Sequence, residues 1–413
     1  MEITIHQALL DPGLEKVNVG VDGGKIAIIT REALPEGDTA IQADGQLLVP
    51  PFFEPHFHLD NPLLWGEVNS SGTLREAIQI YARLKKNRDP GDLVRCASIA
   101  VRESLAYGVL WFRTHVDIDP SVGLRLLQAV VEVKRKFAGV MDIQVIAFPQ
   151  LGMARSPETV ELMYAAMENG ADLVGGIPHH ERDMQDAARQ IEIIFDIAKK
   201  YHAGIDMHVD EDDDPNWQSL ELLADKTLQE GYQGRVNASH CCSMAAWDEA
   251  TFNRIIPKVV AAGVSITTNP LTNLVGQGRG DQPPARRGVP PLDRLVRAGV
   301  NVAVAHDDLK NMFYPFGNMN PLYAANVAAH AGYLTTPDLI RQAFEMPGYH
   351  AAQVFGIQHY GLQPGYPANL LLLPVQSDLD ALRLCPAPTL VMRQGRILAR
   401  TQVQRTFDDC VPL

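Results

Sequence analysis

The sequence is poor in cysteine, in basic residues relative to acidic ones, and in long apolar segments. Five cysteines, with no CxxC pair among them, are too few and too scattered for a disulfide scaffold. We therefore expect a reducing compartment and a cytoplasmic protein. The N-terminal MEITIHQALL has neither the basic start nor the apolar core of a signal peptide. No uncharged apolar run approaches the roughly 18 residues that would indicate a transmembrane helix.

The charge balance excludes a further set of functions. Asp and Glu number 49 against 36 Lys and Arg, which gives a net charge of −13. An acidic protein binds a polyanion poorly, so we expect neither nucleic acid nor a membrane as a partner. With 46% hydrophobic and 21% charged residues, the composition is that of a globular protein. At about 150 residues per domain, 413 residues suggest two or three domains, although an α/β barrel can use about 250 as one.

Short β-rich runs recur along the middle of the chain, with amphipathic helical patterns between them. Eight strands alternating with helices, several of them almost entirely apolar, predict a parallel sheet covered on both faces. Eight such units close most simply into a TIM-like (β/α)₈ barrel, and an open doubly wound sheet is the alternative. The runs lie at 47–58, 109–119, 142–150, 172–178, 204–211, 235–240, 264–270 and 301–308.

The two ends of the chain differ from its middle. Residues 1–50 consist of short strands and turns, and residues 360–413 resume the same pattern. Two β-rich flanks around a barrel are expected to pair with each other. We therefore predict a small β-sandwich domain built from residues 1–50 and 360–413, and a barrel domain over residues 51–359.

Thirteen histidines are the one unusual count, and several of them end predicted strands. Active sites of α/β barrels lie at the carboxyl ends of the strands. His56 and His58 stand two residues apart, so both imidazoles point to one face. Later strands end in His208, His240 and His306-Asp307-Asp308. A single strand-end histidine is often only a hydrogen-bonded core residue, whereas this convergent set is typical of an open catalytic metal site.

The chemistry that such a site supports is metal-assisted hydrolysis. A divalent metal lowers the pKa of a bound water to about 7, so hydroxide is available at neutral pH. Glu211 could move protons between this water and a substrate, although it also belongs to an acidic stretch, 210–214, that could simply be solvated. His240 could bond the water or the attacked centre, and Asp307 could accept the water's proton. No HExxH, GxxxxGK[ST] or GxSxG motif indicates a different chemistry.

A series of longer motifs extends over nearly the whole chain. They are EPHFHLD at 54–60, SGTL at 71–74, FRTHVD at 112–117, IQVIAFPQ at 143–150, DLVGGIPH at 172–179, IDMHVDE at 205–211, ASH at 238–240, NPLTN at 269–273, RRGV at 286–289, HDD at 306–308 and YPFGN at 314–318. In these motifs the sequence resembles the amidohydrolase superfamily, and within it the bacterial cytosine deaminase group. HxH alone would indicate only the superfamily, whereas its combination with FPQ, HxDE, SH and HDD is more specific.

The resemblance implies one divalent metal ion per chain, Fe²⁺ or Zn²⁺, although a His₃Asp set also accommodates Mn. It gives Glu211 the role of a proton shuttle to a ring nitrogen, and His240 that of orienting the hydrolytic water. The fourth strand ends in Gly176-Ile177-Pro178, without the lysine that bridges two metals in other members, so a single metal is expected. The resemblance also favours a homo-oligomer. The implied metal ligands are His56, His58, His208 and Asp307.

Three further residues are expected to contact the substrate. Gln150 would bond the amide edge of a pyrimidine-like ring, although without the resemblance it could equally be a loop residue that satisfies backbone groups. Asp308 would lie near the leaving amino group. Phe313 stands where the group's cytosine deaminases usually have tryptophan, and the loop at Leu63, Leu64 and Trp65 is more apolar than expected. Both departures bear on the shape of the substrate.

The expected reaction is hydrolytic deamination of cytosine or a close amino-heterocycle, such as 5-methylcytosine or isoguanine. Metal-bound hydroxide attacks the amino-bearing ring carbon, and ammonia leaves. Two alternatives remain: hydrolysis of another C–N bond, as in creatinine, an N-alkyl aminotriazine or a cyclic amide, and a non-catalytic barrel scaffold. The complete ligand set and Glu211 speak against the scaffold. His115 and His179 also end predicted strands, and we expect them to be structural or to support the ligands.

Overall fold

The computed structural model describes residues 1–10, 15–67, 69–154, 156–406 and 408, and the chain divides into two compact units. The larger unit comprises Phe52–Tyr360 and Asp378–Cys385, and the smaller one comprises Met1–Pro51, Gly361–Ser377 and Pro386–Leu413. Cys410 lies outside the described residues, and the other four cysteines are free thiols. The two-domain organisation with the borders given above stays a prediction.

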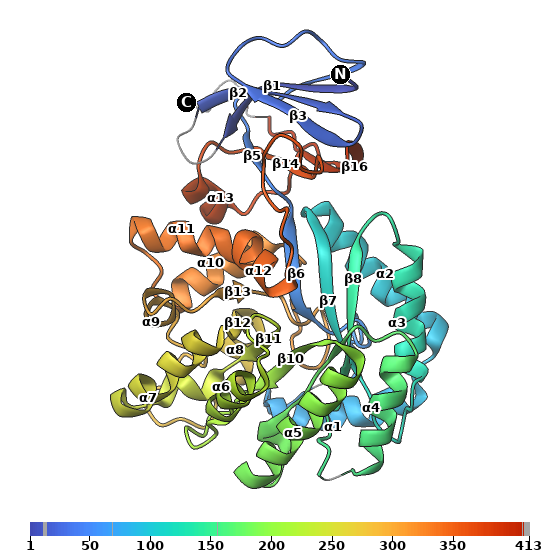
Figure 1. Cartoon of the computed structure of the whole chain (residues 1–413), viewed down its shortest axis with the longest axis vertical. Helices are drawn as coiled ribbons and strands as arrows, with labels where there is room; N and C mark the ends of the chain where they lie inside the picture. Colours follow the sequence, from blue (N-terminus) through green and yellow to red (C-terminus); the bar gives the residue numbers. More distant parts are fainter. Residues whose placement is uncertain (11–14, 68, 155, 407, 409–413) are drawn as a thin grey trace. The chain divides into compact units, whose positions relative to one another are not determined.

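The larger unit contains a barrel of eight parallel strands, paired in chain order (Figure 1). A parallel bridge between Phe57 and Asp307 joins the first strand to the segment after the last one. There the Asp307 N–H donates to the carbonyl of His56 at 3.0 Å, and the His58 N–H donates to the carbonyl of Asp307 at 3.2 Å. The (β/α)₈ barrel is confirmed over the open doubly wound sheet. The strands are β6 (Phe52–Phe57), β7 (Val109–Asp117), β8 (Asp142–Phe148), β9 (Leu173–Val174), β10 (Gly204–Val209), β11 (Val236–His240), β12 (Ser265–Thr268) and β13 (Val302–Val304).

Helices connect these strands and pack on the outside of the barrel (Figure 1). The sequences of the helices explain which face each one buries and at which residue it begins. The helix at Arg125–Lys136 buries Leu127, Val130 and Val133 on one face and exposes Arg135 and Lys136 on the other. Asp183 caps the helix at Met184–Tyr201 by accepting from two first-turn N–H groups.

The helices of the larger unit are α1 (Leu74–Leu84), α2 (Pro90–Ala106), α3 (Arg125–Lys136), α4 (Glu158–Glu168), α5 (Met184–Tyr201), α6 (Ser219–Glu230), α7 (Glu249–Ala262), α8 (Pro270–Gly276), α9 (Leu292–Arg297), α10 (Pro321–Ala331), α11 (Pro337–Glu345), α12 (Ala351–Phe355) and α13 (Asp378–Leu384). Short 3₁₀ segments are η1 (Lys85–Asn87), η2 (Pro178–His180) and η3 (Cys242–Ala246), and η4 (Met346–His350) is a π-helical turn. Among the described residues, we find no helix that combines the length and the apolar character needed to cross a membrane.

The smaller unit is the predicted β structure assembled from both ends of the chain. Strand β5 pairs with β14, so that Leu48 lies opposite Leu372, and this pairing joins the N-terminal to the C-terminal part. The sheet is antiparallel except where β1 pairs with β4 and β5. Apolar side chains from both parts, such as Val19 and Leu370, share one buried core. The strands are β1 (Ile3–Leu10), β2 (Glu15–Asp22), β3 (Lys25–Thr30), β4 (Thr39–Gln42), β5 (Leu47–Val49), β14 (Leu370–Leu373), β15 (Leu390–Arg393) and β16 (Arg396–Arg400).

Candidate active site

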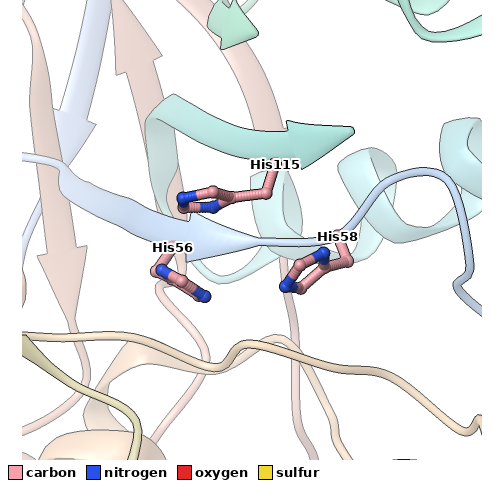
Figure 2. A group of neighbouring side chains, drawn as sticks. All are labelled: His56, His58 and His115. Carbon is pink, nitrogen blue, oxygen red and sulfur yellow. The ribbon is translucent and has the colours of Figure 1, made fainter. Parts of the chain in front are cut away.

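Buried histidines gather where the barrel strands end. His56 lies in β6, His58 directly follows it, and His115 lies in β7 (Figure 2). The ring centroid of His56 is 4.2 Å from that of His115 and 5.5 Å from that of His58. His208 of β10 and His240 of β11 complete the cluster, with ring centroids 4.6 and 4.9 Å from that of His56. All five imidazoles are buried, so their ring nitrogens need partners other than bulk water.

The positions of the ring nitrogens fit a metal ion. Two groups have ligand atoms close enough to share one: His56, His58 and His115, and His56, His208 and His240. Within the predicted ligand set, Asp307 Oδ1 lies 3.3 Å from His56 Nε2 and 3.6 Å from His58 Nε2, and His58 Nε2 lies 3.1 Å from His208 Nε2. Atoms about 2.1 Å from a tetrahedral ion are about 3.4 Å apart, which agrees with these separations. The structure thus brings the four predicted ligands together, and their role stays a prediction.

Two of the predicted residues reach the site through an unusual backbone. His240 has φ 72° and Asp307 has φ 71°, in the left-handed region that residues other than glycine seldom adopt. Neighbouring residues of a regular strand point to opposite faces, yet Ser239 and His240 both direct their side chains to the imidazole cluster. The left-handed turn of the chain at His240 permits this. Backbone strain of this kind recurs at active sites, although other residues of this chain, such as Gln7 and Tyr333, also have a positive φ.

Glu211 lies beside His240 and is buried rather than part of a solvated loop. Its Oε1 is 3.3 Å from Nδ1 of His240. Burial, followed by the negative charges of Asp307 and Asp308, raises the pKa of Glu211 well above its usual range. Burial lowers the pKa of His240 to about 3, so this ring is neutral at physiological pH. A neutral imidazole and a carboxyl side by side can orient a water and carry a proton.

Two asparagines that the sequence analysis missed hold His240 in place. The Nδ2 atom of Asn273 is 3.1 Å from His240 Nδ1, and that of Asn269 is 3.1 Å from His240 Nε2. Asn269 precedes α8 and Asn273 lies within it. Residues four apart on a helix share a face, so the NPLTN motif contained this signal without showing which residue the two amides would meet.

A narrow cavity lies in front of these groups. Gln150, Asp308 and Phe313, the three predicted substrate contacts, all line it, as do His208 and Glu211. Leu74 and Ile78 of α1 add an apolar part to its wall. A larger and more open outer cavity shares Glu211, Leu74 and Ile78 with it. The structure therefore places every predicted contact at one cavity.

Two further residues, one bonded to cavity residues and one lining the cavity, were not given these roles by the sequence analysis. Asn311 donates to Asp308 Oδ1 at 2.5 Å, and its own Oδ1 accepts from the N–H of Phe313 at 2.9 Å, so it fixes two predicted contacts relative to each other. His179 is buried and lines both cavities. In the described part of the chain, neither of its ring nitrogens has a hydrogen-bond partner. A buried imidazole of this kind can take its partner from a bound molecule.

A (β/α)₈ barrel with buried imidazoles and carboxylates around one cavity at its strand ends defines the class of metal-dependent hydrolases. The chain belongs to the amidohydrolase family, whose model matches residues 97–399. That family is metal-dependent and acts on small-molecule substrates. Its relatives described below indicate a hydrolytic enzyme that acts on C–N bonds.

Three comparisons define its relatives. The structure of 5-methylcytosine deaminase from Klebsiella pneumoniae, liganded with 5-fluorocytosine, matches with a TM-score of 0.94 at 35% identity, over 98% of this chain and 99% of that one. N-isopropylammelide isopropyl amidohydrolase of Pseudomonas sp. (strain ADP) is 28% identical over 420 residues, covering 97% of this chain and 98% of the relative. Pterin deaminase of Rhizobium rhizogenes is 28% identical over 400 residues, covering 94% and 89%.

Proposed function

We propose that the protein is a hydrolytic deaminase that releases ammonia from cytosine or a close amino-heterocycle, with 5-methylcytosine the first candidate. The observation that carries this proposal is the inner cavity, which is lined by three of the four predicted metal ligands together with the residues proposed for proton transfer and substrate binding: His58, His208, Asp307, Glu211, Gln150 and Asp308. The overall change replaces the exocyclic amino group by oxygen: the heterocycle and water give the oxo-heterocycle and ammonia. A structural relative at 35% identity that is a 5-methylcytosine deaminase supports the choice of substrate.

The proposed roles follow from the positions of the residues. One divalent ion, Fe²⁺ or Zn²⁺, held by His56, His58, His208 and Asp307, would supply a water activated as nucleophile at neutral pH. Glu211 takes a proton from the attacking water and delivers it to the ring nitrogen next to the amino-bearing carbon, which makes this carbon electrophilic. The same carboxylate then takes the proton of the new hydroxyl group on that carbon and transfers it to the amino group, so that the C–N bond breaks, ammonia leaves and the ring carbon keeps the oxygen. His240, held by Asn273, orients the attacking water.

Substrate recognition is assigned to the remaining cavity residues. Gln150 carries both a donor and an acceptor, which suits the N–C=O edge of a pyrimidine. Asp308, held by Asn311, faces the amino group. Phe313 packs with Tyr81, at a ring distance of 6.1 Å, and against a buried apolar cluster that contains Met312. This fixed apolar wall is suited to a small ring substituent such as a methyl group.

A second candidate is the release of an alkylamine from an N-alkyl aminotriazine. The similarity to N-isopropylammelide isopropyl amidohydrolase favours it, and the apolar wall formed by Leu74, Ile78 and Phe313 could receive an alkyl group. The two candidates share the attack of water on a ring carbon and differ in the leaving group. The predicted homo-oligomer and the predicted cytoplasmic location stay predictions.

The test is a screen with two readouts, ammonia and alkylamine. The protein, loaded with Fe²⁺ or Zn²⁺, is given cytosine, 5-methylcytosine, isoguanine, pterin, creatinine and N-isopropylammelide. We expect ammonia from the aminopyrimidines. Isopropylamine from N-isopropylammelide alone would select the second candidate, and no product from any compound would refute both.

A pair of variants tests the mechanism. Glu211→Gln keeps the size of the side chain and removes the proton shuttle, so we expect turnover to fall by about 10²- to 10⁴-fold. Asp212→Asn is the matched control, because Asp212 lines the outer cavity and not the inner one. Its activity should stay within a few-fold of the wild type. Equal activity of both variants would remove Glu211 from the mechanism.

A further inference from the structure

A chain of polar side chains lies inside the barrel beneath the imidazole cluster. Ser239 Oγ is 2.9 Å from His56 Nδ1. The Ser239 hydroxyl donates to Asp206 Oδ1 at 3.3 Å, and Asn237 Nδ2 donates to the same carboxylate oxygen at 2.9 Å and to Ser239 Oγ at 3.2 Å. The side chains of His56, Ser239 and Asp206 show no exposure, and Asn237 is buried. Asp206 and His208 lie two apart on β10, as do Asn237 and Ser239 on β11, so strand alternation directs each pair into the barrel.

The donors and acceptors of this chain fix the tautomer of His56. A carboxylate only accepts, so in its contact with Asp206 the Ser239 hydroxyl is the donor, and we take its single proton to point there. Ser239 Oγ can then only accept from His56, which places a proton on Nδ1 of the imidazole. The lone pair of the neutral ring is therefore on Nε2, at the opposite side, where Asp307 Oδ1 lies 3.3 Å away. Two acceptors facing each other at this distance need a cation between them.

Asp206, the last side chain of this hydrogen-bonded series, is held rigidly. Arg113 donates to Asp206 Oδ2 at 2.7 Å in a buried ion pair. The same guanidinium donates to Gln144 Oε1 at 2.8 and 3.0 Å, and it lies over the ring of Phe355. Asp206 therefore cannot turn away from Ser239 without breaking a charged interaction in the barrel interior. By contrast, His208 Nδ1 has no hydrogen-bond partner among the described residues.

We propose that Ser239, backed by Asp206, is a positioning residue that presents the Nε2 lone pair of His56 to the metal ion. The inference rests on the proposed function, because it requires His56 to be a ligand. It gives a physical reason for the serine of the ASH motif, to which the sequence analysis assigned no role. Hydrogen-bond partners of this kind orient an imidazole, and their loss costs about 10- to 100-fold in metal affinity.

The test measures metal binding directly. Apparent affinities for Zn²⁺ and Co²⁺ are determined by competition with a chelator at fixed pH, and the Co²⁺ absorption spectrum records the ligand geometry. Ser239→Ala should weaken binding about 10- to 100-fold and change the Co²⁺ spectrum. Ser239→Thr keeps the hydroxyl and should restore most of the affinity. Thermal unfolding of the metal-free proteins shows which variants are folded.

Thr268→Val is the matched control. Thr268 is as buried as Ser239 and ends the next strand, but its hydroxyl has no hydrogen-bond partner in the described structure. It should bind metal as the wild type does. If Ser239→Ala does not fold, Ser239→Cys serves in its place, because a thiol is a weak acceptor of similar size.

The outcomes separate the inference from the proposed function. Wild-type affinity in folded Ser239→Ala or Ser239→Cys would overturn the inference, and so would an equal loss in Thr268→Val. Failure of the wild type itself to bind Zn²⁺ or Co²⁺ would instead refute the metal site of the proposed function.

Discussion

Lys85 offers a test of how the loops around the candidate site are held. It lies in η1 and is 1% exposed, and its Nζ contacts both Asp117 at the end of β7 and Asp119 just beyond it. Burial raises the pKa of Asp117 to about 7. Burial raises the pKa of Asp119 as well, but the Lys85 ammonium outweighs this effect and the net shift is downward. Lys85→Met keeps the length of the side chain and removes its positive charge. Among the ion pairs of the described residues, Lys85 is the only cation paired with Asp117 and Asp119.

The magnitude follows from the burial of the group. Removal of one partner from a buried ion pair costs about 3–5 kcal/mol, because it leaves an uncompensated charge. The cost must depend on pH. Without the Lys85 ammonium, the effect of burial on the pKa of Asp117 is no longer opposed, and at Asp119 burial is opposed only by the hydrogen bonds of Ser121. The native state of the variant therefore binds more protons than the unfolded state, in which these carboxyls titrate at about 3.9. The stability of the variant therefore falls as pH rises from 4 through 7, and its deficit is larger at pH 8 than at pH 5.

Urea unfolding of the wild type and Lys85→Met at pH 5 and pH 8 measures both quantities. Lys86→Met is the control, because Lys86 is the exposed neighbour, and it should change stability by less than about 0.5 kcal/mol. The double variant Lys85→Met/Asp119→Asn should recover part of the loss. A deficit below about 1 kcal/mol, or one that is the same at both pH values, would refute the assignment of Lys85 as a required buried cation.

Three further predictions concern the cavity. Phe313→Trp should lower kcat/KM for 5-methylcytosine relative to cytosine by about 10-fold, because the larger ring takes the space of a methyl group. Steady-state kinetics with both substrates measure this ratio, and an unchanged ratio would contradict the prediction. Asn273→Ala removes a hydrogen bond to His240 and should lower kcat about 5-fold while the metal content, measured by elemental analysis, stays unchanged. His179→Phe keeps an aromatic ring but removes the ring nitrogens, and it should raise KM about 10-fold with the fold intact by circular dichroism. An unchanged KM would exclude a substrate contact.

The barrel was predictable because its strands and helices follow simple periods, and the deviations have local causes. The run at 47–58 splits into β5 and β6 because Pro50 and Pro51 supply no N–H for a ladder. The run at 172–178 forms only the two-residue strand β9. Gly175 follows it in close contact with β8, where a Cβ would lie 2.8 Å from the carbonyl oxygen of Ala147. These are places where sequence pattern shows a strand but not its length.

The candidate site was predictable only where the period of a strand decides the direction of a side chain. His56 and His58 share a face for this reason, and their spacing of two residues is visible in the sequence. His240 and Asp307 follow no such rule, because each reaches the cavity through a positive φ that the sequence does not reveal. Contacts from a distant segment hold the side chains of both residues. Asn269 and Asn273 hold the ring of His240, and the Thr272 hydroxyl donates to Asp307 Oδ2 at 2.5 Å.

These contacts all come from one short segment, the start of α8, which explains why a motif with no metal ligand and no acid belongs to the site. Residues 269–273 hold the side chains of the two site residues that have a positive φ. The hydrogen bonds from Asp206 through Ser239 hold the ring of His56 from inside the barrel. A site built in this way depends on pairs of residues far apart in the chain, such as Asn269 with His240 at a separation of 29 and Thr272 with Asp307 at a separation of 35. No local sequence pattern encodes such a pair. The sequence therefore predicts the residues that perform the chemistry, and only the structure identifies the residues that orient them.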